Sequence, residues 1–365
     1  MTEEDPIAIA EALIASGRAE EAARGLQARL LAGRGGLLAR LTLIKALLAA
    51  GDTGGALVQA REAVSLNPDV AVAVLALGET LLAASESNSG ALPAAIAELQ
   101  RALRLDPGLA RTRELIAAAW LRAGEADKAL ENLRALEHPP AEMMAACQAI
   151  KVAPRSDPGY VRHLFDQFSA DYDERMIGQL AYAAPQILFD LAQLVMPGRA
   201  GASMGKSLAV LDLGCGTGLA GTVFAPLAAQ LDGVDLSPAM IEKARARGIY
   251  HSLWVGDLET ALAADGPRYD LILAADTLVY LGDLAAVFEA ARRRLSADGY
   301  FLFTVEKAEG TGFELGPKRR WRHSQAYLRE LATRTGFDLA GLVAAAPRRE
   351  ANQPVEGFAV ALSRG

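Results

Sequence analysis

The sequence is poor in cysteine, in long apolar runs and in positive charge, and each shortage excludes a class of protein. Only Cys147 and Cys215 occur in 365 residues, so neither a disulfide framework nor a cysteine-based zinc site is expected. No run of about 18 apolar residues is present, which argues against a membrane span. The formal net charge of −7 disfavours nucleic acid and membrane surfaces, since both require a basic face. We therefore expect no metal site, no nucleic-acid partner and no membrane partner.

The first residues and the length set two further expectations. The start, MTEEDP, is acidic and lacks the basic region of a signal peptide, so the expected location is cytoplasmic. A chain of 365 residues is longer than a typical single domain, and two domains are the natural expectation.

Residues 1–137 contain a repeating spacing. Three pairs of small residues are 34 positions apart, namely Gly17 and Gly51, Ala22 and Ala56, and Ala95 and Ala129. Small residues at fixed helical positions let two helices approach closely. The period resembles the tetratricopeptide repeat, which implies an all-α solenoid of about four repeats. Its concave face would bind a peptide or a partner helix, while a purely stiffening or dimer-forming role stays open.

Strand, glycine turn, helix and strand follow one another between Leu208 and Asp235. Leu208 to Leu213 predict a buried parallel strand, a helix is expected to about Gln230, and residues 231–234 predict a second strand. The turn between the first strand and the helix contains Gly214, Gly216 and Gly218, which let a ligand approach the backbone. The carboxylate of Asp235 can accept both hydroxyls of a ribose, so the unit predicts a nucleotide-like ligand.

The charge of Asp212 helps to decide between two kinds of nucleotide. The stretch Gly216 to Gly221 matches the dinucleotide pattern G-x-G-x-x-G, so a nicotinamide or flavin cofactor is an alternative. A carboxylate two residues before Gly214 would repel a pyrophosphate and favour a cation. S-adenosyl-L-methionine has a sulfonium, an ammonium and no phosphate, and is the preferred ligand.

The run from Asp212 to Gly218, with Asp235 beyond it, resembles motif I and the ribose-binding acid of class I S-adenosylmethionine-dependent methyltransferases. The resemblance implies an α/β Rossmann-like core over residues 207–365, with a seven-stranded, mostly parallel sheet. It also implies that the last strand, 357–363, is an antiparallel edge strand. Further cofactor-binding candidates follow the second, third and fourth strands, namely Leu236, Met240, Asp257, Leu258 and Asp276. Asp257 would accept from the adenine amine, or merely cap a helix, and Met240 would contact adenine or belong to the core.

Two proline-containing breaks, at 138–140 and 153–159, predict a linker over residues 138–158. Residues 159–206 then form a helical segment that we expect to be a mobile lid over the cofactor. The phrase from Phe165 to Asp173 resembles one in predicted methyltransferases fused to tetratricopeptide repeats. Phe165 and Phe168 are expected to be core residues, whereas Tyr172 is open between core and cofactor cover.

Two residues are candidates for the chemistry itself. Glu306 is expected at the tip of the fifth strand, near the methyl acceptor. His323 lies in the most basic cluster, Lys318 to Ser324, of which Lys318 and Arg319 are expected to lie in a solvated loop. An imidazole titrates near pH ~6.5 and can act as a base at neutral pH. Arg320 or Arg322 could hold an acidic acceptor by paired hydrogen bonds.

The sequence thus predicts a methyltransferase acting on an unidentified small-molecule, peptide or protein acceptor, with repeats that bind a partner or the substrate. The alternative is a non-catalytic repeat adaptor whose Rossmann-like domain only senses the cofactor.

Overall fold

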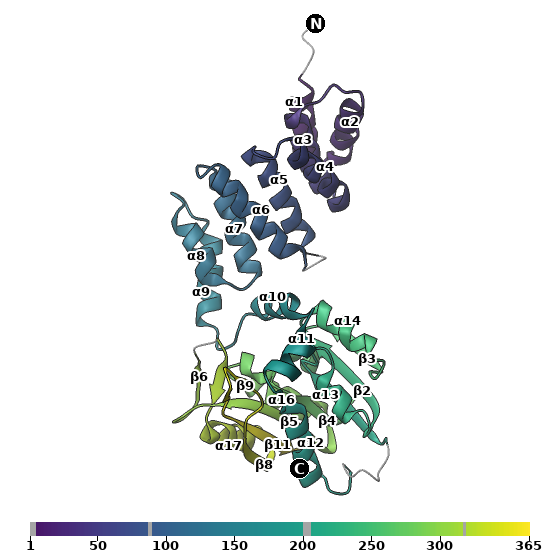
Figure 1. The fold of residues 1–365 in the computed structure, drawn as a ribbon, viewed down its shortest axis with the longest axis vertical. Coiled ribbons are helices and arrows are strands. Elements are labelled where there is room, and N and C mark those ends of the chain that lie inside the picture. The colour runs from purple at the N-terminus through teal and green to yellow at the C-terminus, as the bar shows by residue number, and fades with distance from the viewer. Residues whose placement is uncertain (1–4, 87–89, 200–205, 317–318) are drawn as a thin grey trace. The chain divides into compact units, whose positions relative to one another are not determined.

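The computed structural model describes residues 5–86, 90–199, 206–316 and 319–365, and its chain divides into two compact units. The units are Met1–Val152 and Ala153–Gly365 (Figure 1). Each unit is described by itself below. Within the described ranges, none of the helices has both the length and the apolar character needed to cross a bilayer.

The first unit is helical throughout, as predicted. Its helices are α1 (Pro6–Ala15), α2 (Ala19–Leu31), α3 (Leu37–Ala49), α4 (Thr53–Leu66), α5 (Ala71–Ala84), α6 (Ala91–Leu105), α7 (Ala110–Arg122), α8 (Ala126–Arg134) and α9 (Ala141–Val152). Each helix packs on the next, and short turns join them.

The four alanines of the 34-residue spacing lie where helices meet, whereas Gly17 and Gly51 are exposed in turns with positive φ. Ala56, Ala95 and Ala129 are completely buried. A Cβ on Gly78 of α5 would approach Leu99 of α6 to 2.7 Å, so only glycine permits this close packing. The spacing therefore has a structural cause, which is close contact between neighbouring helices.

The stretch expected to be a linker, 138–158, is mostly structured, which corrects that prediction. Helix α9 occupies it and packs on α7 and α8, and its Cys147 is fully buried there. The proline pair at 139–140 lies between the end of α8 at Arg134 and the start of α9 at Ala141, so it does not end the helical unit.

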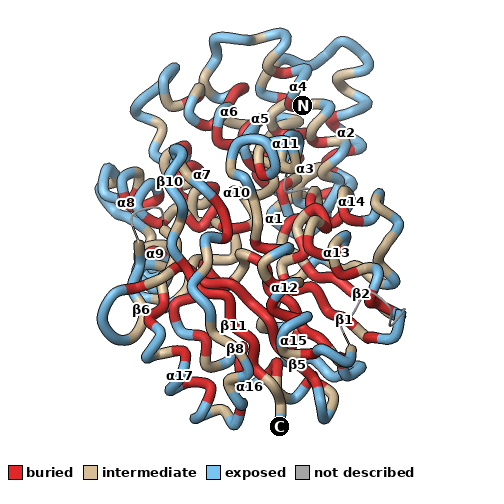
Figure 2. Tube along the Cα trace, turned by 60° about the horizontal axis from the view of Figure 1, so that its bottom comes forward, coloured by how far each residue is buried: buried red, intermediate tan, exposed pale blue. Residues whose placement is uncertain are grey.

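The second unit contains a twisted sheet in the order β3-β2-β1-β4-β5-β11-β8, with β6 and β7 attached at β5. Its strands are β1 (Leu208–Leu213), β2 (Ala228–Asp235), β3 (Ser252–Val255), β4 (Tyr269–Ala274), β5 (Leu295–Lys307), β6 (Phe313–Leu315), β7 (Trp321–His323), β8 (Asp338–Ala345) and β11 (Gly357–Ser363); β9 (Arg349–Glu350) and β10 (Gln353–Pro354) form a separate ribbon. The Rossmann-like, mostly parallel sheet is as predicted. The central strands are almost entirely buried (Figure 2).

The last strand is not at the edge, contrary to the prediction. β11 lies between β5 and β8 and runs antiparallel to both. Its residues 357–362 are buried, which is the behaviour of an inner strand.

Helices cover both faces of the sheet. They are α10 (Pro158–Phe168), α11 (Tyr172–Glu174), a π-helical turn η1 (Arg175–Gln179), α12 (Ala184–Val195), α13 (Leu219–Phe224), α14 (Pro238–Ala246), α15 (Leu258–Ala263), a 3₁₀ turn η2 (Leu278–Tyr280), α16 (Ala285–Arg294) and α17 (Gln325–Arg334). One core cluster joins α12 and α13 to the sheet, and a second joins α16 and α17 to its other face.

One local prediction was wrong. The helix expected to reach Gln230 ends at Phe224, because Pro226 has no amide hydrogen to continue the helical hydrogen bonds, and β2 already begins at Ala228. The basic cluster that ends at Ser324 contains β7, which pairs with β5 and β6, and Arg319, expected in a loop, lies outside that strand. Lys318 lies outside the described residues.

Candidate active site

The glycine turn after β1 requires residues without side chains. Gly214, Gly216 and Gly218 have φ of +63°, +55° and +89°, in the left-handed region. A Cβ on Gly214 would collide with the side chain of Thr277. A Cβ on Gly216 would meet nothing within 4 Å, because that glycine borders a cavity. The turn therefore offers bare backbone to a ligand.

Asp235 is fixed at the end of β2 beside this turn. One carboxylate oxygen accepts from the Gly216 amide at 2.9 Å, and the other accepts from the Ser237 amide at 2.8 Å. Burial raises the pKa of Asp235 to about 6, although the two amides act in the opposite direction. The side chain is half-buried and is oriented before any ligand arrives.

A cavity of about 70 Å³ lies at the carboxyl ends of the strands. Most of the predicted cofactor-binding residues line it, namely Tyr172, Gly214, Gly216, Asp235, Leu236, Asp257, Leu258 and Asp276. Ligand pockets for small molecules commonly reach about 300–1,000 Å³. The cavity must therefore widen to take a nucleoside-sized cofactor.

Three predicted contacts do not line this cavity, which corrects the prediction for them. Asp212 is 1% exposed and accepts a hydrogen bond from the Tyr250 hydroxyl at 2.7 Å. Successive side chains of a strand point to opposite faces, so Asp212 lies on the same face of β1 as Val210. Helices α12 and α13 pack on that face. Gly218 is packed against Arg247 and Tyr250, and Met240 is fully buried in the core.

Asp257 has two roles in the structure. It caps α15 by accepting from the amides of Glu259 and Thr260, and it pairs with Arg155 at 2.6 Å. Arg155 belongs to the expected linker, yet it lines the cavity and also pairs with Glu259. The backbone around it is pinned, because the Pro154 carbonyl accepts from the Gly282 amide at 2.8 Å.

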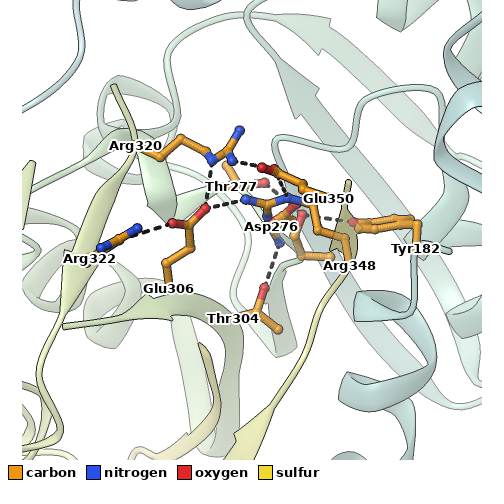
Figure 3. Close-up of polar contacts among 10 residues, drawn as sticks. Tyr182, Asp276, Thr277, Thr304, Glu306, Arg320, Arg322, Arg348 and Glu350 are labelled. Carbon is orange, nitrogen blue, oxygen red and sulfur yellow. Dashed lines mark hydrogen bonds and ion pairs between the residues drawn. The ribbon is translucent and has the colours of Figure 1, made fainter. Parts of the chain in front are cut away.

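Asp276 lines the cavity and belongs to a buried network of ion pairs centred on Arg348 (Figure 3). It has a left-handed φ of +57°, and such strain in a residue other than glycine concentrates at functional sites. Arg348 is 4% exposed through its side chain and pairs with three carboxylates, those of Asp276, Glu306 and Glu350. Burial alone would lower the pKa of Arg348, but Asp276 and Glu306 raise it above its usual value.

Glu306 belongs to this network and not to the cavity, which corrects its assignment to the chemistry. It pairs with Arg348 and, at 2.6 Å, with Arg320 (Figure 3). Arg322 pairs with its other oxygen at 3.6 Å, so three guanidinium groups surround this buried carboxylate and leave it unavailable to a methyl acceptor.

His323 is also removed from the chemistry. It is fully buried on β7, one ring nitrogen lies 2.9 Å from the Gly282 carbonyl, and the ring stacks on Tyr327. Burial lowers the pKa of His323 to about 4, so the ring is neutral at pH 7. A side chain in the core cannot reach a substrate.

The segment before the sheet is fastened to the glycine turn. Phe165 lies between Tyr172 and Tyr280, with ring centroids at 6.0 and 5.7 Å, and all three line the cavity. Asp166 accepts from the Ser237 hydroxyl at 2.5 Å, while Asp173 accepts from Thr217 and pairs with Arg247. Phe165 therefore covers the site, although it was expected to be a core residue.

Two residues that the structure brings to this region, Arg155 and Arg348, were not predicted from the sequence. No motif singles them out, because each reaches the site from a segment distant in sequence. The helix-breaking context of Arg155 was the only available signal, and it was read as a linker.

Comparisons with known proteins concern the second unit. Residues 211–301 match the family model described as "Methyltransferase domain". Over 118 residues the chain is 36% identical to Methyltransferase-like protein 27 of Homo sapiens, covering 32% of this chain and 46% of that protein. Over 103 residues it is 32% identical to the Ubiquinone biosynthesis O-methyltransferase of Xanthomonas oryzae pv. oryzae (strain PXO99A), covering 27% of this chain and 43% of that protein.

Among solved structures, the magnesium protoporphyrin IX methyltransferase of Synechocystis PCC 6803 with bound SAM aligns with a TM-score of 0.43 and 20% identity, over 57% of this chain and 98% of that one. The chain spans less than half the length of the curated relatives named above. Residues 211–301, with the glycine turn and Asp235 among them, are a methyltransferase domain.

Proposed function

We propose that the protein is an S-adenosylmethionine-dependent methyltransferase whose cofactor lies over the glycine turn. The observation that carries the proposal is the charge of the cavity wall. Three carboxylates line it, those of Asp235, Asp257 and Asp276, against one guanidinium, that of Arg155, which pairs with Asp257. The remaining negative charge repels the pyrophosphate of a dinucleotide and attracts a sulfonium and an ammonium.

The residues present fit this cofactor. Asp235 is oriented to accept from the ribose hydroxyls, and Gly216 leaves space that a side chain would fill. We assign Asp257 and Leu258, which line the cavity, to the adenine end, and Asp276 to the amino-acid end. S-adenosylmethionine supplies an activated methyl group, so the protein has to align the acceptor and exclude water. Such orientation is worth on the order of 7–11 kcal/mol.

We also propose that residues 159–182 act as a lid. The small cavity supports this, because a nucleoside cannot enter while Phe165 and Tyr172 lie over the turn. The π-helical turn at Arg175–Gln179 supports it further, since such turns are frequent at functional sites. The helical segment expected from the sequence extends to residue 206, and its residues 200–205 lie outside the described chain.

The helical unit is proposed to be a tetratricopeptide array that binds a peptide, a protein partner or the substrate. The supporting observation is the burial of Ala56, Ala95 and Ala129 at helix contacts spaced by the repeat.

A cytoplasmic location is proposed from the reduced cysteines, both of which are buried and unpaired.

Calorimetric titration tests the cofactor proposal. S-adenosylmethionine should bind and NAD should not; uptake of NAD alone would reject the proposal.

Turnover with a cell extract then separates an enzyme from a cofactor-sensing adaptor. An enzyme releases S-adenosylhomocysteine, whereas an adaptor binds the cofactor and releases none.

A further inference from the structure

A second cavity, of about 280 Å³, adjoins the cofactor cavity. The two share Phe165, Tyr172, Asp276 and Tyr280 in their walls. The second cavity is therefore the natural place for the molecule that receives the methyl group, if the proposed function holds.

Aromatic rings are concentrated in this second cavity. Only 6% of the chain is Phe, Trp or Tyr, yet five such residues line the cavity, namely Tyr160, Phe165, Phe168, Tyr172 and Tyr280. Aromatic walls favour a flat, apolar ligand body, because rings gain offset or edge-to-face contacts with one another. The volume is close to the lower end, about 300 Å³, of the range usual for small-molecule sites.

The cavity wall also carries positive charge that the protein does not neutralise. Its carboxylates, Asp276 and Glu350, are each paired with Arg348. Arg320, also in the wall, is paired with Glu306 and Glu350. Arg175 lines the same cavity, and among the described residues no carboxylate forms an ion pair with it.

Arg175 is nevertheless held in position. Its guanidinium lies 4.4 Å from the centroid of the Phe168 ring. This cation–π contact covers one face of the guanidinium. The backbone of the π-helical turn is pinned at its end, since the Leu180 carbonyl accepts from the Arg349 amide at 2.7 Å. A guanidinium oriented in this way has its hydrogen-bond donors available to a ligand.

Two hydroxyl groups add to the donors. Within the described part of the chain, the hydroxyls of Tyr172 and Tyr280 have no hydrogen-bond partner, and both residues line the cavity. Burial raises the pKa of both tyrosines well above the usual value, so they stay protonated and can donate.

We propose that the second cavity binds a small aromatic carboxylic acid, whose carboxylate is held by Arg175 and whose ring lies among Phe165, Phe168 and Tyr280. This rests on the proposed methyltransferase function for the acceptor role, but the binding site itself follows from the cavity. An aromatic amine is disfavoured because the unpaired groups are donors and one of them is cationic.

Three ligands with one aromatic body separate these possibilities: cinnamate, the neutral cinnamamide and the cationic cinnamylamine. Each is titrated by calorimetry into the full chain at pH 7.5, with and without saturating S-adenosylhomocysteine. Cinnamate should bind at least about tenfold more tightly than the amide or the amine, as a charge-assisted hydrogen bond implies. Equal affinities, a preference for the amine, or no binding of the acid would overturn the proposal.

Variants assign the preference to Arg175. Arg175→Gln should reduce cinnamate binding to the level of the amide, and Arg175→Lys should restore part of the difference. Arg245→Gln removes an exposed arginine on α14 and should change nothing. Phe168→Leu removes the ring that supports the Arg175 guanidinium and should weaken acid binding. This variant tests the site independently if Arg175→Gln does not fold.

The two proposals fail separately. If S-adenosylhomocysteine binds but the acid preference is absent or survives in Arg175→Gln, only the acid site is rejected. If S-adenosylhomocysteine does not bind while cinnamate is still preferred, the methyltransferase proposal is rejected and the acid site stands.

Discussion

The carboxylate of Asp173, in the segment before the sheet, accepts a hydrogen bond from the hydroxyl of Thr217 in the glycine turn. The same carboxylate pairs with Arg247, whose guanidinium also donates to the Thr217 carbonyl. One acidic side chain thus joins the proposed lid, the turn and the end of α14.

Replacing Asp173 with Asn should loosen the lid. The amide loses the ion pair with Arg247, so S-adenosylhomocysteine should dissociate faster, by about three- to tenfold given the roughly 1 kcal/mol of a partly buried pair. Stopped-flow displacement measures the rate. Glu174→Gln, an exposed neighbour, is the matched control, and equal rates in both variants would argue against a lid fastened at Asp173.

Asp235→Ala should weaken S-adenosylmethionine binding by about 10- to 100-fold, since hydrogen bonds to a charged acceptor contribute about 1.5–3 kcal/mol. With the pKa of Asp235 near 6, affinity should also fall as the pH drops below about 6, because the carboxylate becomes protonated. Calorimetry between pH 5 and 8 measures both effects. An affinity that does not change in Asp235→Ala would remove Asp235 from the cofactor site.

The buried Asp212 should make the protein more stable at pH 5 than at pH 8. Burial raises its pKa to about 7 from 3.8, so between these values the folded state holds a proton that the unfolded state has lost. Stability then falls as pH rises, by roughly 2–3 kcal/mol between pH 5 and 8. Urea unfolding of Asp212→Asn should lose this contribution, whereas exposed Asp265→Asn should keep it.

His323→Ala should destabilise the fold and spare cofactor binding. The change leaves a cavity beside Tyr327 and an unpaired Gly282 carbonyl, which costs about 2–4 kcal/mol. Chemical denaturation measures the loss, and calorimetry on the folded variant measures affinity. Normal stability combined with a selective loss of turnover would return His323 to the role of a base.

Glu306→Ala should be among the most destabilising single changes in the second unit. It leaves Arg348 buried with fewer compensating carboxylates, and breaking a buried pair costs about 3–5 kcal/mol. Glu306→Gln keeps the shape and should cost less. A thermal unfolding midpoint unchanged in both variants would show that the network contributes little.

Local patterns predicted much of the fold. The strand at Leu208–Leu213 and the turn at Gly214–Gly218 were predictable because apolar runs and glycines act over a few residues. The end of the helix at Phe224 was missed although Pro226 is visible in the sequence. The position of β11 between β5 and β8 was not predictable from its residues, since a buried inner strand and a buried edge strand read alike.

The candidate site divides in the same way. Asp235, Asp257 and Asp276 were found because each lies at or just beyond the end of a strand, and the carboxyl ends of parallel strands share one edge. Asp212 and Met240 were candidates for contact with the ligand because of their positions in the sequence. In the structure both side chains point into the core and are buried.

By itself the sequence determined the glycine turn, the acids after the strands and the 34-residue helical spacing, because these depend on neighbours within one or two elements. Only the tertiary structure decided that Glu306 and His323 are structural, and that Arg155, Arg175 and Arg348 face the cavities. The physical reason is that burial and ion pairing depend on what packs around a side chain, and those partners come from elsewhere in the chain.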